Sequence, residues 1–282
     1  MNLNKFKIKD KKSIIKEIYS FSKLKDLFNL TNNNEVLVIF DVDDVLITPS
    51  SEDNLRHPYR NQLLQSILKR ITPEEFELLK SSIFLNTKQV LVELKIIDIF
   101  EHLKSHKIPA IALTTMGTGK FGIIKKMHDF RFKQLNSVNL SFKCLTPLAD
   151  EHIMLELAKI NKRFLDLNCK GNPMLKSGII FTSGLDKGMV LEYILKKYNY
   201  YPKTIIFIDD LIENVKSLQQ ICFKLNINFY GFHYTAASLI ALSNIDENLE
   251  KLRFAILEKE FTWLSYDKLQ DEKYNARLEV RH

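Results

Sequence analysis

The sequence predicts an α/β fold, a three-layer Rossmann-like sheet of parallel strands with helices on both faces. Short apolar runs alternate along the chain with longer segments whose apolar residues recur at helical spacing. Within each short run the apolar residues are consecutive, as in strands that are covered on both faces. The chain has 282 residues, of which 45% are hydrophobic, enough for one sizeable domain with an insertion or for two small ones.

Five core strands are expected, each an apolar run bounded by polar or turn-forming residues. In chain order they cover residues 35–40, 108–115, 177–183, 204–210 and 227–234. Helical periodicity marks the segments around and between them, at residues 95–108, 121–130, 152–167, 185–201 and 211–225. Strands separated by helices are typical of a parallel sheet, because parallel neighbours need a long crossover connection.

The expected core, residues 35–235, carries a helical extension at each end. Residues 1–34 are predicted to be an N-terminal helical extension, because the apolar residues between positions 12 and 30 recur at helical spacing. Residues 236–282 are predicted to be a helical tail packed on the core.

An insertion is expected at residues 47 to about 90, between the first two core strands. It contains two short helical patterns, and Thr72 and Pro73 suit the N-cap and first position of the second. This position in the chain is a natural one for a small helical cap over the strand ends.

The charge balance is basic, with a formal net charge of +7 and a pI near 9.1. An anionic partner, either a phosphate group or an acidic membrane surface met by the basic N-terminal segment, would explain this excess. Biased lysine usage that only solvates the surface is the favoured explanation. No motif with base-reading side chains is found, so nucleic acid is not expected as a partner.

Cysteine usage and the N-terminus bear on location. Cys144, Cys169 and Cys222 match no zinc or disulfide spacing, which favours reduced thiols in a cytosol-like compartment. No apolar run approaches the roughly 18 residues that span a bilayer. The first residues are basic but lack the apolar core of a Sec signal peptide.

Four of the expected strands end in polar residues suited to chemistry. The first delivers Asp41 and Asp43, the second Thr114 and Thr115, the third leads by a short turn to Lys187, and the fourth delivers Asp209 and Asp210. In an open α/β sheet, ligands bind beyond the carboxyl ends of the strands. We therefore expect these carboxylates, hydroxyls and one ammonium to meet at one edge of the sheet.

A cluster of carboxylates at a strand end needs cations beside it, because like charges repel and a buried unpaired charge is costly. Lys187 supplies one positive charge. Mg²⁺ suits the remainder, because it takes oxygen ligands and keeps room for water and a phosphate. No cluster of histidine and cysteine competes, so zinc is disfavoured.

Four short stretches at these strand ends resemble the motifs of the haloacid dehalogenase-like superfamily. They are "VIFDVDDVL", "IALTT", "GLDKGMVL" and "FIDDLIENV", which occur in the superfamily's order between residues 36 and 218. The resemblance implies a Rossmann-like core and a Mg²⁺-dependent phosphoryl transfer through an aspartyl-phosphate. An acid at position 43 points to phosphomonoester hydrolysis or phosphotransfer, since superfamily members without it need no proton for the leaving group.

The resemblance also implies roles for the catalytic residues. Asp41 would be the nucleophile, and Asp43 would protonate the leaving oxygen and later deprotonate the attacking water. Thr114, with Thr115 beside it, would hydrogen-bond the phosphoryl oxygens. Lys187 would neutralise Asp41 and the charge that develops during transfer.

The implied metal ligands are the Asp41 carboxylate, the main-chain carbonyl of Asp43, and Asp210. Either member of the Asp209–Asp210 pair could contact the metal, and Asp210 is favoured because it aligns with the Asp of the commoner Gly-Asp form of the motif. Asp209 and Asn214 would then orient water and Lys187 from outside the metal's own ligands.

Looser stretches resemble a subgroup of the superfamily from bacteria that live inside eukaryotic cells. They are "RFKQLNSVNLSF", "GIIFTSGLDKG", "FYGFHYT" and "FTWLSYDK", although the last lacks the acid that the subgroup's pattern has after Ser265. The subgroup includes secreted effectors with phosphotyrosine phosphatase activity. It implies a phosphoprotein or a small phosphomonoester as substrate, and a location in the cytoplasm or, by a non-Sec route, in a host cell.

Two other functions stay open. The chain could bind phosphate or anionic lipid on the same fold with little or no turnover, but all four catalytic positions are filled. It could also be a phosphomutase or a kinase-like phosphotransferase, although no nucleotide-binding loop is found.

Several further polar or aromatic residues have structural interpretations. His57 and Arg60 are expected in a solvated loop of the insertion, and Arg131 on the surface, although each could contact a substrate. His233 is expected to be a satisfied core histidine, and Trp263 to be packed in a core.

Overall fold

The computed structural model describes residues 13–24, 27, 35–148, 151–159 and 170–271. The chain forms two compact units, each assembled from several segments. Unit 1 contains the chain up to Thr48, Leu91–Gly119 and Met127–Leu239, and unit 2 contains Pro49–Val90, Lys120–Lys126 and the chain from Ile240.

Unit 1 is built on an eight-stranded sheet in the order β1-β10-β9-β2-β5-β8-β7-β6. The strands in this order are Ser13–Ile18, Asn228–Tyr234, Thr204–Asp209, Val36–Phe40, Ala110–Thr114, Ile179–Phe181, Met174–Lys176 and Glu151–Ile153. The first six are parallel to one another, whereas β7 pairs antiparallel with both β8 and β6. The predicted mostly parallel α/β sheet is confirmed, and all five expected core strands are present.

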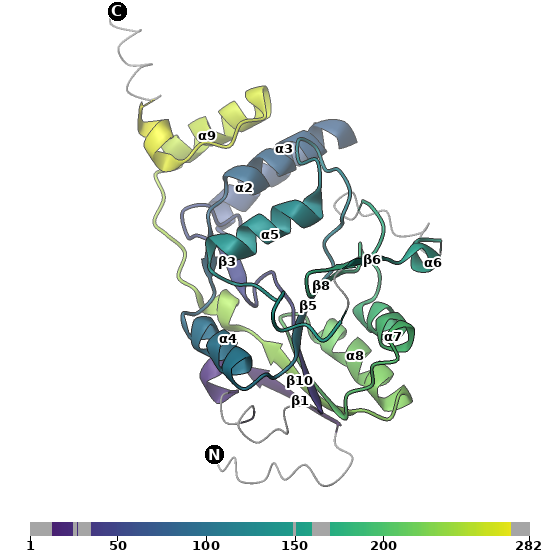
Figure 1. Ribbon diagram of the computed structural model, residues 1–282. Helices are drawn as coiled ribbons and strands as arrows, with labels where there is room; N and C mark the ends of the chain where they lie inside the picture. Colours follow the sequence, from purple (N-terminus) through teal and green to yellow (C-terminus); the bar gives the residue numbers. More distant parts are fainter. Residues whose placement is uncertain (1–12, 25–26, 28–34, 149–150, 160–169, 272–282) are drawn as a thin grey trace, which may run out of the picture. The chain divides into compact units, whose positions relative to one another are not determined.

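Helices cover both faces of this sheet, which gives three layers (Figure 1). One face carries α4 (Lys95–Ser105) and α5 (Met127–Ser137), and the other carries α7 (Lys187–Lys197) and α8 (Ile212–Lys224). Successive residues of β2 alternate between the two cores: Val38 and Phe40 pack on one side, Leu37 and Ile39 on the other. This alternation explains the unbroken apolar runs, because every position of a doubly covered strand is buried.

The predicted N-terminal helix is wrong for residues 13–18. They form β1, which pairs in parallel with β10 at one edge of the sheet. Ile14 packs against one hydrophobic core and Ile15 against the other, as neighbours in a strand do. In the described part nearby, the 3-10 turn η2 (Phe21–Lys23) and Leu27 are helical, and residues 1–12, 25–26 and 28–34 lie outside the described part.

Two other predicted helices are shorter than expected or shifted. The pattern at 121–130 becomes a tight antiparallel bridge, Phe121 to Ile124, and a helix, α5, that begins only at Met127. Gly122 in the bridge has a φ of 52°, which ends helical geometry. The pattern at 152–167 yields β6 and one helical turn, α6 (Leu155–Ala158), and residues 160–167 lie outside the described part.

Unit 2 is a helical unit made of α2 (Pro58–Leu68), α3 (Pro73–Asn86) and α9 (Glu247–Glu260). Thr72 caps α3 through a complete capping box with Glu75, as its sequence predicts. The ends of the insertion, β3 (Ile47–Pro49) and β4 (Gln89–Leu91), pair as a two-stranded sheet.

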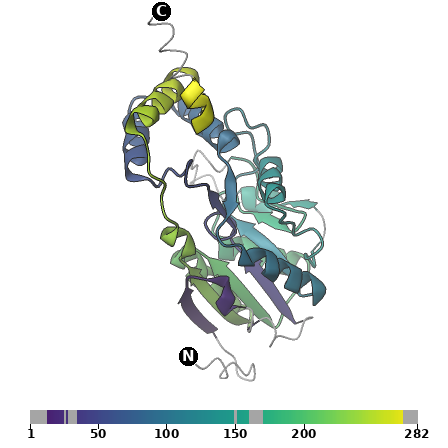
Figure 2. The ribbon, with the colours of Figure 1, turned by 90° about the vertical axis from the view of Figure 1, so that its left-hand side faces the viewer.

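The C-terminal tail is predicted to pack on the core. Ala236, at its start, does pack against the unit 1 core, but from Ile240 onward the tail belongs to unit 2. Helix α9 lies beside α2 (Figure 2). The core of the unit joins all three helices and consists of Leu64, Ile67, Leu79, Ile83, Phe254, Leu257 and Trp263. The reason is that the insertion helices have an apolar face of their own that needs a partner, and the tail supplies it.

A buried group of charges holds the tail in unit 2. Arg60 lies in α2 and not in the solvated loop that was expected. Its Nε lies 2.7 Å from Glu250 Oε1, and both side chains are fully buried. Arg253 pairs with Asp53 and lies flat over Trp263, 3.6 Å from the ring centroid. Trp263, buried as expected, donates its indole N–H to Asp53.

Among the described residues, none of the helices combines the length and the apolar character that crossing a bilayer requires.

Candidate active site

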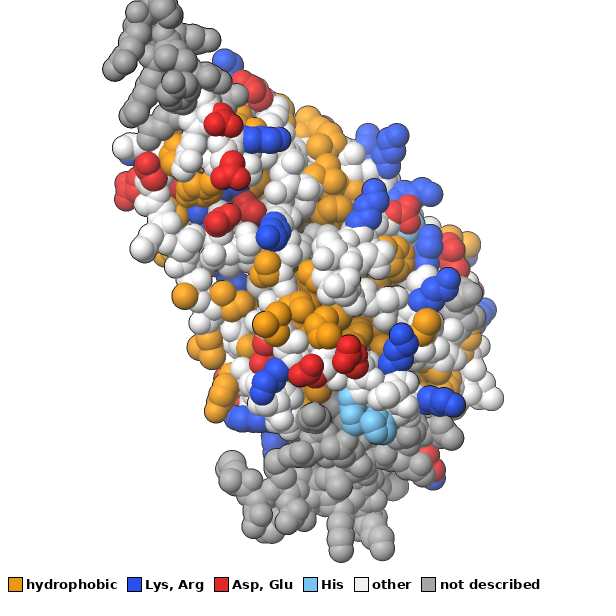
Figure 3. All heavy atoms as spheres, turned by 60° about the vertical axis from the view of Figure 1, so that its left-hand side comes forward, with side chains coloured by type: hydrophobic (Ala, Val, Ile, Leu, Met, Phe, Trp, Pro, Cys, Tyr) orange, Lys and Arg blue, Asp and Glu red, His pale blue; other side chains and the backbone are white. Residues whose placement is uncertain are grey.

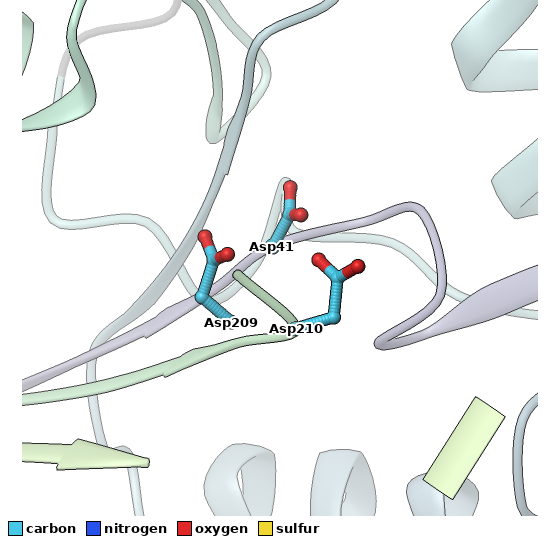
Figure 4. A group of neighbouring side chains, drawn as sticks. All are labelled: Asp41, Asp209 and Asp210. Atoms are coloured by element: carbon cyan, nitrogen blue, oxygen red, sulfur yellow. The ribbon is translucent and has the colours of Figure 1, made fainter. Parts of the chain in front are cut away.

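Three carboxylates meet where β2 and β9 end, side by side at the centre of the sheet. Phe40 is in register with Ile208, and the Asp41 N–H donates to the Ile208 carbonyl at 2.9 Å. Asp41 therefore leaves β2 next to Asp209 and Asp210 (Figure 4). One oxygen from each of the three side chains lies within 4.8 Å of the others.

Lys187, the first residue of α7, reaches the same point. Its Nζ lies 2.8 Å from Asp41 Oδ1 and 2.6 Å from Asp209 Oδ2, and its side chain is buried. The helix begins here because Asp186 caps it, accepting from the Met189 N–H. Gly188 permits α7 to lie against α8, since a Cβ there would come within 2.4 Å of Ser217 Oγ.

The threonines lie at the end of β5, the strand on the other side of β2. Thr114 is buried, and its Oγ1 accepts from the Met116 N–H at 3.3 Å, while Thr115 is exposed. The loop after β5 is bound to the loop that leads to Lys187: Thr182 N–H donates to the Thr114 carbonyl, and Gly184 N–H donates to the Thr115 carbonyl. The chain thereby fixes the threonines and Lys187 at one edge.

Burial raises the pKa of Asp41 well above its usual range. The charge of Lys187 lowers this pKa, and the charges of Asp209 and Asp43 raise it further. Burial by itself would lower the pKa of Lys187, but the charges of Asp41 and Asp209 outweigh it and raise that pKa. For Asp210, burial and the charges of Asp209 and Asp44 raise the pKa to about 6.

The two neighbouring acids on β9 differ in how many of their oxygens are engaged. Asp209 Oδ2 accepts from Lys187, and its Oδ1 accepts from the Leu211 N–H and from Asn214 Nδ2 at 3.0 Å. Both oxygens of Asp209 are therefore taken by protein donors. Asp210 is half-buried and shares a hydrogen bond with Asp41, so these two carboxylates are the better placed to face a cation.

His233 lies behind this pair. Its Nε2 lies 3.0 Å from the main-chain carbonyl of Asp210, so it carries the proton that this hydrogen bond needs. This agrees with the expected satisfied histidine.

Asp43 lies apart from the three clustered carboxylates. Its side chain is 58% exposed, and its Oδ2 accepts from Arg131 Nη2 at 2.6 Å. Arg131 is 2% exposed, so the expectation that it lies on the surface is wrong.

The sequence holds a signal for Arg131. Met127, Arg131 and Leu135 are spaced four apart on α5 and share one buried stripe, because positions i and i+4 lie on the same face of a helix. An arginine in such a stripe indicates that a charged partner reaches the buried face of the helix.

The donors at this edge fit a hard divalent cation. When Asp41, Asp209 and Asp210 are ionised, Lys187 offsets one of three negative charges, and two remain. The donors are carboxylate oxygens without nitrogen or sulfur, the set that Mg²⁺ prefers. The cysteines described, Cys144 and Cys222, are free thiols, and Cys169 lies outside the described residues.

The loop glycine at position 119 has a structural role. A Cβ there would lie 3.1 Å from main-chain atoms of Lys170 and Gly171. Gly119 and Thr118 both donate their N–H groups to the Lys170 carbonyl. Glycine at position 119 therefore allows the main chain of Lys170 and Gly171 to approach closely.

The face drawn in Figure 3 carries lysine and arginine side chains scattered among acidic and apolar ones. On that face, the described residues do not gather the excess positive charge into one basic patch.

Comparisons with known proteins give one family and several relatives. The profile of the family described as "Protein of unknown function (DUF2608)" matches residues 12–270. A Chlamydia pneumoniae protein named "Putative outer membrane protein" is 27% identical over 203 residues, 72% of this chain and 70% of that protein. An "Uncharacterized protein" of Rickettsia felis is 24% identical over 237 residues, 79% of this chain and 77% of that protein.

A "Putative outer membrane protein" of Chlamydia trachomatis is 31% identical over 94 residues, 32% of this chain and 36% of that protein. No solved structure matches the chain at a comparable level of significance. The family profile runs through almost the whole chain, both units included. The protein is therefore a member of the DUF2608 family.

Proposed function

We propose that this protein is a Mg²⁺-dependent phosphomonoester hydrolase of the haloacid dehalogenase-like type, with Asp41 as its nucleophile. One observation carries the proposal. Lys187 Nζ lies within 2.8 Å of Asp41 and 2.6 Å of Asp209, and Asp210 completes an oxygen cluster at the carboxyl ends of the two central strands. A buried ammonium beside a carboxylate nucleophile suits a reaction in which negative charge arrives and must be neutralised.

The chemistry of the protein's own groups balances in two steps. A carboxylate oxygen of Asp41 attacks phosphorus and forms an aspartyl-phosphate, while the bond to the leaving oxygen breaks and Asp43 gives that oxygen its proton. Asp43, now a carboxylate, then takes a proton from a water that attacks phosphorus. Phosphate leaves, and Asp41 is regenerated as a carboxylate.

Asp41, Asp210 and the Asp43 carbonyl would hold Mg²⁺, which would neutralise charge on the phosphoryl oxygens. Asp209 and Asn214 position Lys187, because Asp209 holds the ammonium while Asn214 holds Asp209. Thr114 and Thr115 would bind phosphoryl oxygens at the end of the neighbouring strand.

For the substrate we propose a phosphoprotein, with phosphotyrosine as the first candidate, because of the subgroup that the sequence resembles. A partly exposed Asp43 is compatible with a bulky leaving group at the edge of the site. Contact with an anionic membrane through an N-terminal helix is harder to support, since residues 13–18 of that segment form a strand within the sheet.

The location proposed for this activity is the cytoplasm, or a host cell reached by a non-Sec route. Two relatives carry the name of outer membrane proteins, which adds the bacterial surface as a third candidate. Fractionation of cells and culture medium, followed by immunoblotting, distinguishes the three.

The test is hydrolysis of p-nitrophenyl phosphate and of a phosphotyrosine peptide by the purified protein. Turnover is expected with Mg²⁺ and should be lost after EDTA treatment and in Asp41→Asn. Glu101→Gln is the matched control, because Glu101 is an exposed acid on α4 and should not matter. Phosphate binding without turnover in the wild type would instead favour the non-catalytic binding protein.

A further inference from the structure

Arg131 on α5 is a buried cation whose described partner is a single exposed acid. Its Nη2 donates to Asp43 Oδ2 at 2.6 Å, with the arginine 2% and the aspartate 58% exposed. Arginine is almost never fully buried unless it is paired. The pair with Asp43 therefore explains how a charged Arg131 can be buried. The apolar packing around Arg131 does not explain why an arginine is present at this position.

The rest of the guanidinium group is poorly satisfied. Its Nε and Nη1 are buried and have no hydrogen-bond partner among the described residues, and neither does Oε1 of Gln134, one turn further along α5. Each buried polar group left without a partner costs about 1–3 kcal/mol. A methionine would fill the same buried stripe without this cost. The simplest reason for an arginine here is therefore a function for its hydrogen bond from Nη2 to Asp43 Oδ2.

The helix that carries Arg131 is firmly anchored. His128 Nδ1 donates to the Thr118 carbonyl at 2.9 Å, and the Met127 N–H donates to the Gly119 carbonyl at 3.1 Å. Phe132 packs edge-on against Phe181 of β8, with ring centroids 6.1 Å apart. Arg131 is therefore presented to Asp43 from a fixed element, and it does not follow the loop in which Asp43 lies.

We propose that Arg131 is the positioning residue of Asp43. It holds Oδ2 from the buried side and leaves Oδ1 directed to the reacting oxygen. This inference rests on the proposed function, because it gives Asp43 the proton-transfer role assigned there. A guanidinium fixed by packing holds the Oδ2 atom at one position through this single hydrogen bond, whereas a lysine on a flexible stem would hold it less firmly. Positioning of this kind matters because a misplacement of about 1 Å can cost about 100-fold in rate.

The kinetic test uses Arg131→Met and, as a matched control, Lys133→Met, which removes an exposed cation of the same helix. With a phosphotyrosine peptide, Arg131→Met should lower kcat by about 10- to 100-fold and change KM little, because a displaced acid–base group loses less than the roughly 10²- to 10⁴-fold lost when the group is removed. The loss should be smaller in the burst with p-nitrophenyl phosphate, whose leaving group needs no proton. Lys133→Met should match the wild type.

A double-mutant cycle shows whether Arg131 acts through Asp43. In an Asp43→Asn background, Arg131→Met should lower kcat by less than about 3-fold, because the group that it positions is already gone. A full, independent loss in that background would overturn the inference. So would a raised KM with unchanged kcat, since Arg131 would then bind the substrate itself.

Two measurements guard against a variant that merely fails to fold. Guanidinium ion at low millimolar concentration should restore part of the kcat of Arg131→Ala, which it would not do for an unfolded protein. In ¹³C-carboxyl NMR of aspartate-labelled protein, the Asp43 signal, identified by Asp43→Asn, should move in Arg131→Met but not in Lys133→Met.

The NMR arm needs no activity, so the two proposals fail separately. An unmoved Asp43 signal, or an active wild type that Arg131→Met leaves unchanged, would overturn the role of Arg131 alone. A wild type with an intact pair that hydrolyses no phosphomonoester would overturn the proposed function, and the positioning role with it.

Discussion

Asp209 and Asp210 are neighbours in the chain, but their carboxylates have different hydrogen-bond partners. Asp209 already accepts hydrogen bonds at both oxygens, from Lys187 on one side and from Leu211 and Asn214 on the other. The side chain of Asp210 shares a hydrogen bond with Asp41, with which it would also share a cation. The distinction can be measured by exchanging each carboxylate for an amide.

Asp210→Asn should weaken Mg²⁺ binding by at least about 10-fold, the loss typical of disturbing a metal's ligand environment. Asp209→Asn should bind Mg²⁺ nearly as well but lower kcat, because it weakens the hold on Lys187. Mg²⁺ titration by calorimetry and by initial rate separates the two effects. The reverse order of the two variants would make Asp209 the metal ligand.

The two residues proposed to carry the phosphoryl group and the proton can be separated by trapping. Asp41→Asn removes the proposed nucleophile, so no labelled phosphoenzyme should form. Asp43→Asn keeps the nucleophile but lacks the base for hydrolysis, so labelled aspartyl-phosphate should accumulate while turnover falls by about 10²- to 10⁴-fold. Phosphoenzyme in Asp41→Asn, or unimpaired turnover in Asp43→Asn, would contradict these assignments.

The raised pKa values of Asp41 and Asp210 also predict how stability depends on pH without metal. A carboxyl group with a higher pKa in the folded state favours folding in its protonated form, so its contribution is present below the unfolded pKa of about 4 and is lost as pH rises. For Asp210 this loss should centre on the pH range from about 4 to about 6. Asp41, whose pKa burial raises well above its usual range, contributes a loss in the same direction.

The measurement is the free energy of unfolding against pH for wild type and Asp210→Asn in EDTA, since their difference removes the contributions of other groups. The wild type should lose stability relative to Asp210→Asn as pH rises. Added Mg²⁺ should oppose the loss, and more strongly at higher pH, because it binds the ionised carboxylates. If the wild type instead gained stability relative to Asp210→Asn as pH rises, the pKa of Asp210 would not be raised in the folded state.

At the scale of elements, α9 shows how a tail becomes part of an insertion's core. Phe254 and Leu257 pack with the insertion helices, and Arg253 bonds Asp53, the Glu52 carbonyl and the Leu264 carbonyl. Breaking a buried charged pair from one side typically costs about 3–5 kcal/mol, because the other charge is left unpaired.

Arg253→Met should therefore destabilise unit 2 by an amount of this order, whereas Lys251→Met, an exposed cation two residues away, should change stability by less than about 0.5 kcal/mol. Urea denaturation followed by fluorescence of Trp263, which lies in this core, measures both. Equal stabilities of the two variants would contradict a structural role for the buried charges.

The elements also show where sequence reasoning succeeds and where it fails. The central strands and the polar residues that end them are predictable from short stretches of sequence. A strand buried on both faces appears as consecutive apolar residues, and the polar residues at its end follow directly in the chain. Strand β1 is not, since Ile14, Ile15 and Ile18 fit a helix as well as a strand, and the choice depends on β10, more than 200 residues away. Arg131 was missed for the same reason, because its partner Asp43 lies 88 residues earlier.

For the whole molecule, the segmented make-up of unit 2 predicts which stretches lose structure together. In Arg253→Met, amides in 49–90, 120–126 and 240–271 should lose hydrogen-exchange protection at the same denaturant concentration, although they are far apart in sequence. Strands β2 and β9 should keep their protection, because unit 1 has its own two cores. Simultaneous loss from both units would mean that they unfold as one cooperative body.

The order in which these segments leave the ribosome matters as well. Helix α3 ends at Asn86, but its partner α9 begins at Glu247, so about 160 residues separate them. At a translation rate of roughly 5–20 residues per second, the apolar face of α2 and α3 stays exposed for about 10–30 s before α9 is synthesised. The nascent chain should therefore be a strong client of chaperones that bind exposed apolar helices, up to the moment when α9 emerges.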